Sequence, residues 1–118
     1  MAPEDMVNLI AYLRLHNVRM YCLSGMKTSL HADAKQHFID VHYGDDIRLL
    51  STCSAESKVE IVSILQDVFG CEPCEVLFID DLREVVDSMK RNGYVSLLAS
   101  EVKDIRIHGL SLTEVLDD

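Results

Sequence analysis

The feature that most constrains the fold is a continuous apolar run that ends in two acidic residues. Residues 76–79 (Val-Leu-Phe-Ile) contain no polar interruption, and Asp80 and Asp81 follow them directly. An unbroken apolar run is typical of a parallel strand that is covered on both faces, whereas a half-exposed strand alternates. Ligand sites in open parallel sheets lie at the carboxyl ends of the strands. Asp80 and Asp81 are therefore the first candidate functional residues.

Helical and extended patterns alternate along the rest of the chain. Apolar spacing and turn residues predict helices over residues 3–16, 28–37, 54–70, 82–93 and 113–116, and extended segments over 18–23, 38–41 and 94–99. This alternation predicts an α/β fold, a Rossmann-like and mostly parallel sheet with flanking helices. A length of 118 residues suits one domain, so residues 1–118 are predicted to form a single domain.

Composition and charge exclude several classes of partner. The formal net charge of -9 argues against nucleic acid, because proteins that bind phosphate backbones carry a basic face. No apolar run approaches the roughly 20 residues of a membrane helix, and the first residues lack the pattern of a signal peptide. We expect an intracellular protein in the cytoplasm, with an organelle as the alternative. The four cysteines are accordingly predicted to be free thiols.

Two adjacent carboxylates at the end of a buried strand have two physical interpretations. Carboxylate oxygens are the ligands that Mg²⁺ prefers, and a hard cation would offset the repulsion between Asp80 and Asp81. Alternatively, both side chains are solvated and Asp81 caps the following helix, a position that aspartate favours. The acidic pair alone leaves both interpretations open.

The order of several motifs resembles that of the haloacid-dehalogenase-like (HAD-like) hydrolases. Residues 75–86, an apolar strand ending in an acidic pair, are similar to the fourth motif of these enzymes. Lys58 on the preceding helix resembles the third motif, and Ser24, at the end of Tyr-Cys-Leu-Ser, resembles the second. Residues 37–46 are similar to the stretch between these two. The resemblance covers roughly residues 6 to 100, and small capless magnesium-dependent phosphatases are the nearest comparison.

The resemblance implies phosphoryl transfer through an aspartyl-phosphate. Asp80 and Asp81 would hold Mg²⁺ directly or through water. Lys58 would offset charge on the nucleophile and the phosphate, and the Ser24 hydroxyl would donate to a phosphate oxygen. Taken singly, Lys58 also fits a solvated helix lysine and Ser24 a turn serine. Together the motifs predict that all four side chains lie at one end of the sheet.

The first motif of the family has no counterpart in this sequence. HAD-like hydrolases carry an apolar strand ending in Asp-x-Asp before the second motif, and only a helical pattern precedes Ser24. Asp40 follows an apolar pair but comes after Ser24, and no second aspartate follows it at the right spacing. We therefore expect a non-catalytic structural or interaction module. The alternative is a fragment of a magnesium-dependent phosphatase that acts on a small phosphorylated substrate and takes its nucleophile from other sequence.

The missing motif would also supply the central strand of the sheet. Without it, the apolar strands predicted at 18–23 and 76–79 have unpaired edges, and such edges favour association. The two strands could pair with each other, or a second chain could supply the pairing. We expect the second possibility, in which the other chain is a partner protein or another copy of this chain in a homo-oligomer.

Overall fold

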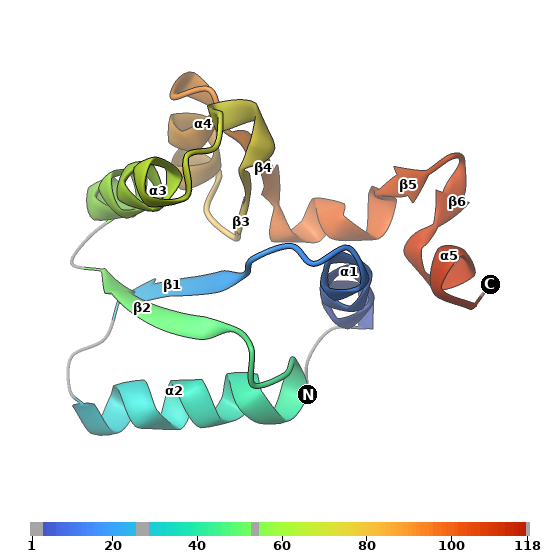
Figure 1. The fold of residues 1–118 in the computed structure, drawn as a ribbon, viewed down its shortest axis with the longest axis horizontal. Coiled ribbons are helices and arrows are strands. Elements are labelled where there is room, and N and C mark those ends of the chain that lie inside the picture. The colour runs from blue at the N-terminus through green and yellow to red at the C-terminus, as the bar shows by residue number, and fades with distance from the viewer. Residues whose placement is uncertain (1–3, 26–28, 53–54, 118) are drawn as a thin grey trace. The chain divides into compact units, whose positions relative to one another are not determined.

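Helices and strands alternate in the computed structural model, which describes residues 4–25, 29–52 and 55–117. This order confirms the α/β class (Figure 1). The elements are α1 (Glu4–Leu15), β1 (Tyr21–Gly25), α2 (Ser29–His42), β2 (Arg48–Thr52), α3 (Ala55–Phe69), β3 (Leu77–Asp80), α4 (Arg83–Arg91), β4 (Val95–Leu98), β5 (Arg106–Ile107), β6 (Leu110–Ser111) and α5 (Leu112–Asp117), with 3₁₀ turns at Pro73–Glu75 and Ala99–Asp104.

The chain divides into two compact units. Unit 1 comprises residues 1–51 and 102–118, and unit 2 comprises residues 52–101. The described strands form the pairs β1–β2, β3–β4 and β5–β6. Each of the two apolar strands expected from the sequence thus has a partner from the same chain, β2 for β1 and β4 for β3. A single larger sheet, and association with a second chain, remain predictions.

Unit 2 is built on the parallel pair β3–β4. Leu77 is opposite Val95, and Asp80 at the end of β3 is opposite Leu98 at the end of β4. Helix α4 packs on both strands and buries Met89 completely. The strand and helix that the sequence predicts around Asp80 are therefore confirmed. The expected cover on both faces of the strand is not, because Leu77 is 40% exposed. Together β3 and α4 set the backbone position of the acidic pair.

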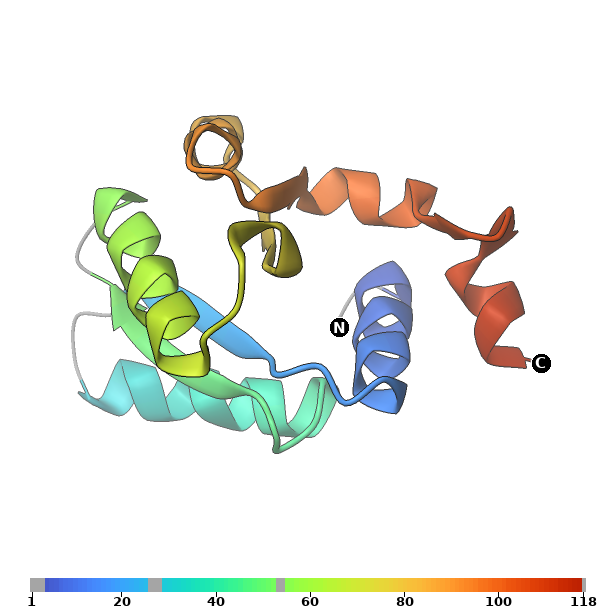
Figure 2. The same ribbon diagram turned by 45° about the horizontal axis from the view of Figure 1, so that its top comes forward.

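Unit 1 is built on β1 and β2, whose arrows run side by side in the same direction in Figures 1 and 2. Gln36 of α2 ties the helix to β2: its amide nitrogen donates to the carbonyl of Ile47, 2.9 Å away, and its amide oxygen accepts from the backbone nitrogen of Leu49, 3.0 Å away. Helix α1 packs against α5, where Asn8 donates to the hydroxyl of Thr113 over 2.8 Å. Strand β2 was not expected from the sequence.

The end of α2 corrects one prediction. Residues 38–41 were expected to be extended, but α2 continues to His42. Gln36 bonds to the backbone of residues 47 and 49, and Ile39 is buried. Residues three apart share a face in a helix but point to opposite faces in a strand, so these contacts favour a helix through residue 39. The backbone nitrogens of Tyr43 and Gly44 both bond to the carbonyl of Ile39, and Gly44 has a φ of 116°, which favours glycine after a helix.

None of the helices in the described ranges has the length and apolar character needed to cross a bilayer.

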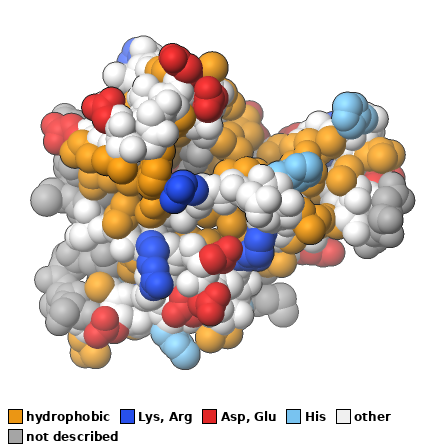
Figure 3. Space-filling view, in the orientation of Figure 1, with side chains coloured by type: hydrophobic (Ala, Val, Ile, Leu, Met, Phe, Trp, Pro, Cys, Tyr) orange, Lys and Arg blue, Asp and Glu red, His pale blue; other side chains and the backbone are white. Residues whose placement is uncertain are grey.

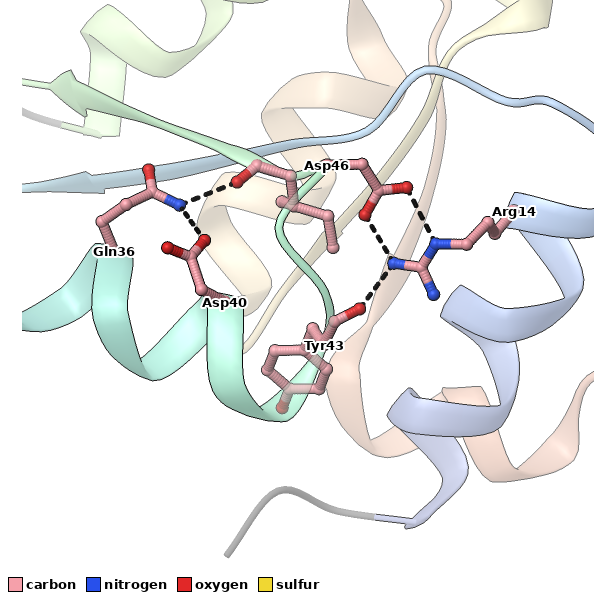
Figure 4. Close-up of polar contacts among 6 residues, drawn as sticks. Arg14, Gln36, Asp40, Tyr43 and Asp46 are labelled. Carbon is pink, nitrogen blue, oxygen red and sulfur yellow. Dashed lines mark hydrogen bonds and ion pairs between the residues drawn. The ribbon is translucent and has the colours of Figure 1, made fainter.

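A bidentate ion pair closes the turn after α2. The Nε and Nη2 atoms of Arg14 donate to the two carboxylate oxygens of Asp46 over 2.8 and 2.6 Å, and Nη2 also reaches the carbonyl of Tyr43 over 2.5 Å (Figure 4). The hydrogen bond from Arg14 holds the pKa of Asp46 below its ordinary value of 3.8, against a smaller opposing effect of burial. The pair joins α1 to the turn that leads into β2.

We expect Asp46→Asn to destabilise the chain near neutral pH but not in acid. A carboxylate whose folded pKa is depressed adds stability above its unfolded pKa and loses it as the pH falls through the folded value. The side chains are about half exposed, so the loss should be at most about 1 kcal/mol near neutral pH. The free energies of unfolding of the parent and the variant, measured by urea denaturation at several pH values, should converge below about pH 4. A difference that persists unchanged in acid would contradict this role of the charge.

Candidate functional site

Asp80 is the last residue of β3, and its side chain is nearly buried. Its exposed fraction is 7%, and that of the Lys58 side chain on α3 is 16%. Nζ of Lys58 lies 2.7 Å from Oδ2 of Asp80. Two of the residues singled out from the sequence, in the third and fourth motifs of the resemblance, are therefore in direct contact within unit 2.

The second carboxylate oxygen of Asp80 is also engaged. The backbone nitrogen of Leu82 donates to Oδ1 over 3.0 Å, which is the local turn that aspartate forms with the residue two positions later. Lys58 donates to one carboxylate oxygen, and the backbone amide of Leu82 donates to the other. Asp80 thus links α3, the end of β3 and the turn into α4.

The electrostatics of Asp80 follow from these contacts. Burial alone raises the pKa of the carboxyl group, because a low dielectric disfavours the charged form. The hydrogen bonds from Lys58 and from the Leu82 amide, a contact with the Asp81 side chain and the charge of Lys58 together outweigh this effect, so the pKa lies below its ordinary value of 3.8. Asp80 is therefore ionised at neutral pH, and Lys58 is its counter-charge.

Asp81 differs from Asp80 in its surroundings. Its side chain is exposed, and α4 begins at Arg83 with Leu82 as the N-cap residue. The alternative interpretation, in which Asp81 caps this helix, is therefore wrong, because Asp81 lies one residue too early. Because Asp81 is exposed, solvent or a cation can reach its carboxylate.

The donor set fits Mg²⁺ only in part. Asp80 and Asp81 supply carboxylate oxygens, the ligand type that Mg²⁺ prefers. However, the ammonium group of Lys58 is already at Oδ2 of Asp80 and would repel a cation bound to the same carboxylate. Over the described ranges, no group of three or more His, Cys, Asp or Glu side chains is arranged to hold a metal.

Ser24 is in unit 1, near the end of β1, and is partly buried. The ammonium group of Lys35 on α2 donates to its hydroxyl oxygen. Lys35 was missed from the sequence, because a lysine in a polar helix carries no signal that distinguishes it from a solvated one. Since Ser24 and the Lys58–Asp80 pair belong to different units, their predicted convergence remains a prediction.

The thiols of Cys71 and Cys74 are reduced, as expected, and Cys53 lies outside the described residues.

Comparison of the chain with protein-family models, with curated proteins and with solved structures gave no match. The HAD-like resemblance therefore rests on the motifs and on the contact between two of them.

Proposed function

We propose that this chain is a HAD-like module that has no aspartate nucleophile of its own and serves as a structural or interaction subunit. In this proposal, residues 1–118 form one domain with a Rossmann-like, mostly parallel sheet. The role of Asp80 carries the proposal: its two carboxylate oxygens accept hydrogen bonds from Lys58 and from the Leu82 amide. In this proposal Asp80, the acidic residue of the fourth motif, has a structural role instead of a catalytic one.

The sequence supports the same conclusion. No Asp-x-Asp pattern occurs anywhere in the 118 residues. Ser24, Lys58, Asp80 and Asp81 could orient a phosphate and a cation, but none of them is placed as the aspartate that forms the covalent intermediate. The chain alone would therefore carry the remainder of a phosphate site without its nucleophile.

A second candidate function is part of a magnesium-dependent phosphatase for a small phosphorylated substrate. The observation that favours it is the same contact, because a lysine beside the acidic pair is what the resemblance implies. Asp80 and Asp81 would then hold Mg²⁺, which would neutralise phosphate oxygens when bound. A separate polypeptide segment would have to provide the nucleophile.

We expect the purified chain to release no phosphate from a generic aryl phosphate, with or without Mg²⁺. Without a nucleophile the covalent step has no acceptor for the phosphoryl group. The assay should compare the parent with Asp80→Asn, which removes the charge but keeps the size of the side chain. Magnesium-dependent turnover that Asp80→Asn abolishes would overturn the proposal and establish the phosphatase.

Titration with Mg²⁺ separates the two candidates further. The binding is measured by NMR from the amide signals of residues 80–82. If Lys58 stabilises the fold, the parent should bind Mg²⁺ weakly. Lys58→Met should strengthen the binding, because the competing ammonium is gone. Tight binding in the parent that Lys58→Met weakens would favour the phosphatase.

A further inference from the structure

The outward face of α2 is apolar and exposed. Leu30 is 78% exposed, Val41 62% and Phe38 44%, and Ala34 is also exposed. Their spacing of four, four and three residues places them in one stripe along the helix. We call Leu30, Ala34, Phe38 and Val41 the α2 stripe. Exposed apolar side chains that gather in one patch are a mark of an interaction surface, whereas single ones are not.

The opposite face of α2 is already held in place. Ile39 is buried, Gln36 bonds to the backbone of β2, and Lys35 donates to Ser24 of β1. These contacts fix the rotation of the helix about its axis. The α2 stripe therefore cannot turn inward without breaking them.

One edge of the stripe is acidic. Asp33 and Asp40 are both exposed, and seven residues, or two helical turns, separate them, so they lie on the same side of the helix. The amide of Gln36 donates to Asp40 over 2.9 Å and orients its carboxylate (Figure 4). Figure 3 shows hydrophobic, acidic and histidine side chains over α2. A binding partner of this face would meet apolar surface bordered by negative charge.

We propose that the α2 stripe docks an amphipathic helix of a partner protein whose polar flank carries lysine or arginine. The inference rests on the proposed function in one respect, because an interaction module needs such a surface. Apolar side chains of the partner would cover the stripe, and its cations would pair with Asp33 and Asp40. The net charge of -9 would speed the encounter with a basic segment.

A second copy of this chain fits the surface less well. Two copies related by a two-fold axis present the same patch to each other. If their α2 helices packed antiparallel, the edge with Asp33 and Asp40 would face the same edge of the other copy. Like charges at such an edge oppose pairing, and each copy carries the charge of -9.

The test uses the full chain and two synthetic peptides. Both peptides place leucine along one helical face, and the remaining positions are lysine in one and glutamate in the other. Binding is measured by fluorescence anisotropy. We expect saturable binding of the lysine peptide and no binding of the glutamate peptide. The double variant Leu30→Asp/Val41→Asp should abolish binding although it makes the chain more acidic. The matched variant Ile64→Asp/Val68→Asp, which changes two exposed apolar residues of α3, should bind like the parent.

A separate variant tests the contribution of the acidic edge, Asp33 and Asp40, to binding. Asp33→Asn/Asp40→Asn should weaken binding by about fivefold, the effect of losing two exposed ion pairs. Equal binding of the two peptides, equal loss in the α3 control, or no binding at all would overturn the proposal. So would a dimer of the chain, seen by sedimentation, that Leu30→Asp/Val41→Asp dissociates, because the occupant would then be a second copy. None of these readings depends on phosphatase activity, so the two proposals can fail separately.

Discussion

Replacing Lys58 with methionine is expected to lower the free energy of unfolding by about 3 kcal/mol. The change removes the counter-charge of Asp80, whose side chain is only 7% exposed. The ionised carboxylate then keeps the hydrogen bond from the Leu82 amide but has lost its cation in a nearly buried position. Methionine keeps the length and the apolar stem of lysine. The loss therefore reports the charge rather than the packing.

Lys90→Met provides the control. Lys90 is exposed on α4 of the same unit, and its replacement changes the net charge of the chain equally. Its effect should stay within about 0.5 kcal/mol, as for most surface substitutions. Urea denaturation followed by circular dichroism gives both values. Equal effects of the two variants would mean that the contact seen between Lys58 and Asp80 does not stabilise the chain.

Replacing Met89 with alanine is expected to cost about 3 kcal/mol as well, for a different reason. Met89 is fully buried where α4 packs on β3 and β4. Truncation removes apolar contacts and leaves a cavity that the surrounding backbone can only partly fill. Ile64→Ala on the exposed face of α3 is the matched control and should cost much less. A small effect of Met89→Ala would show that unit 2 has no fixed core under α4.

The sequence predicted the elements around Asp80 well because their signals are local and strong. The apolar run of β3 and the apolar spacing of α4 each specify one kind of element. Asn92 and Gly93 mark the end of the helix, and the structure has Asn92 as its C-cap with Gly93 at a φ of 89°. Nothing distant was needed to place this part of the fold.

Other elements were missed because their signals are weak. Strand β2 starts at Arg48 and ends in polar residues, so it lacks both a continuous apolar run and a clear alternation. The β5–β6 hairpin turns at His108 and Gly109, both at positive φ. Asn-Gly is the usual sequence signal for such a turn. Here His108 replaces the asparagine, and His-Gly does not predict a hairpin.

The candidate site was predictable only through the resemblance. Composition and spacing single out Asp80 and Asp81, but no pattern within α3 identifies Lys58 as the partner of Asp80. The hydrogen bond from the Leu82 amide could have been foreseen, because an aspartate commonly bonds to the residue two positions later. The contact between Lys35 and Ser24 could not, since it depends on how α2 packs on β1.

A double-mutant cycle measures whether Lys58 and Asp80 stabilise the fold through their mutual contact. Unfolding free energies are measured for the parent, Lys58→Met, Asp80→Leu and the double variant. If the pair is a mutual structural contact, the double variant should be more stable than the sum of the single losses predicts, with a coupling of about 2 kcal/mol. Additive losses, with a coupling near zero, would show that the contact does not stabilise the fold and would leave Lys58 and Asp80 available for another role.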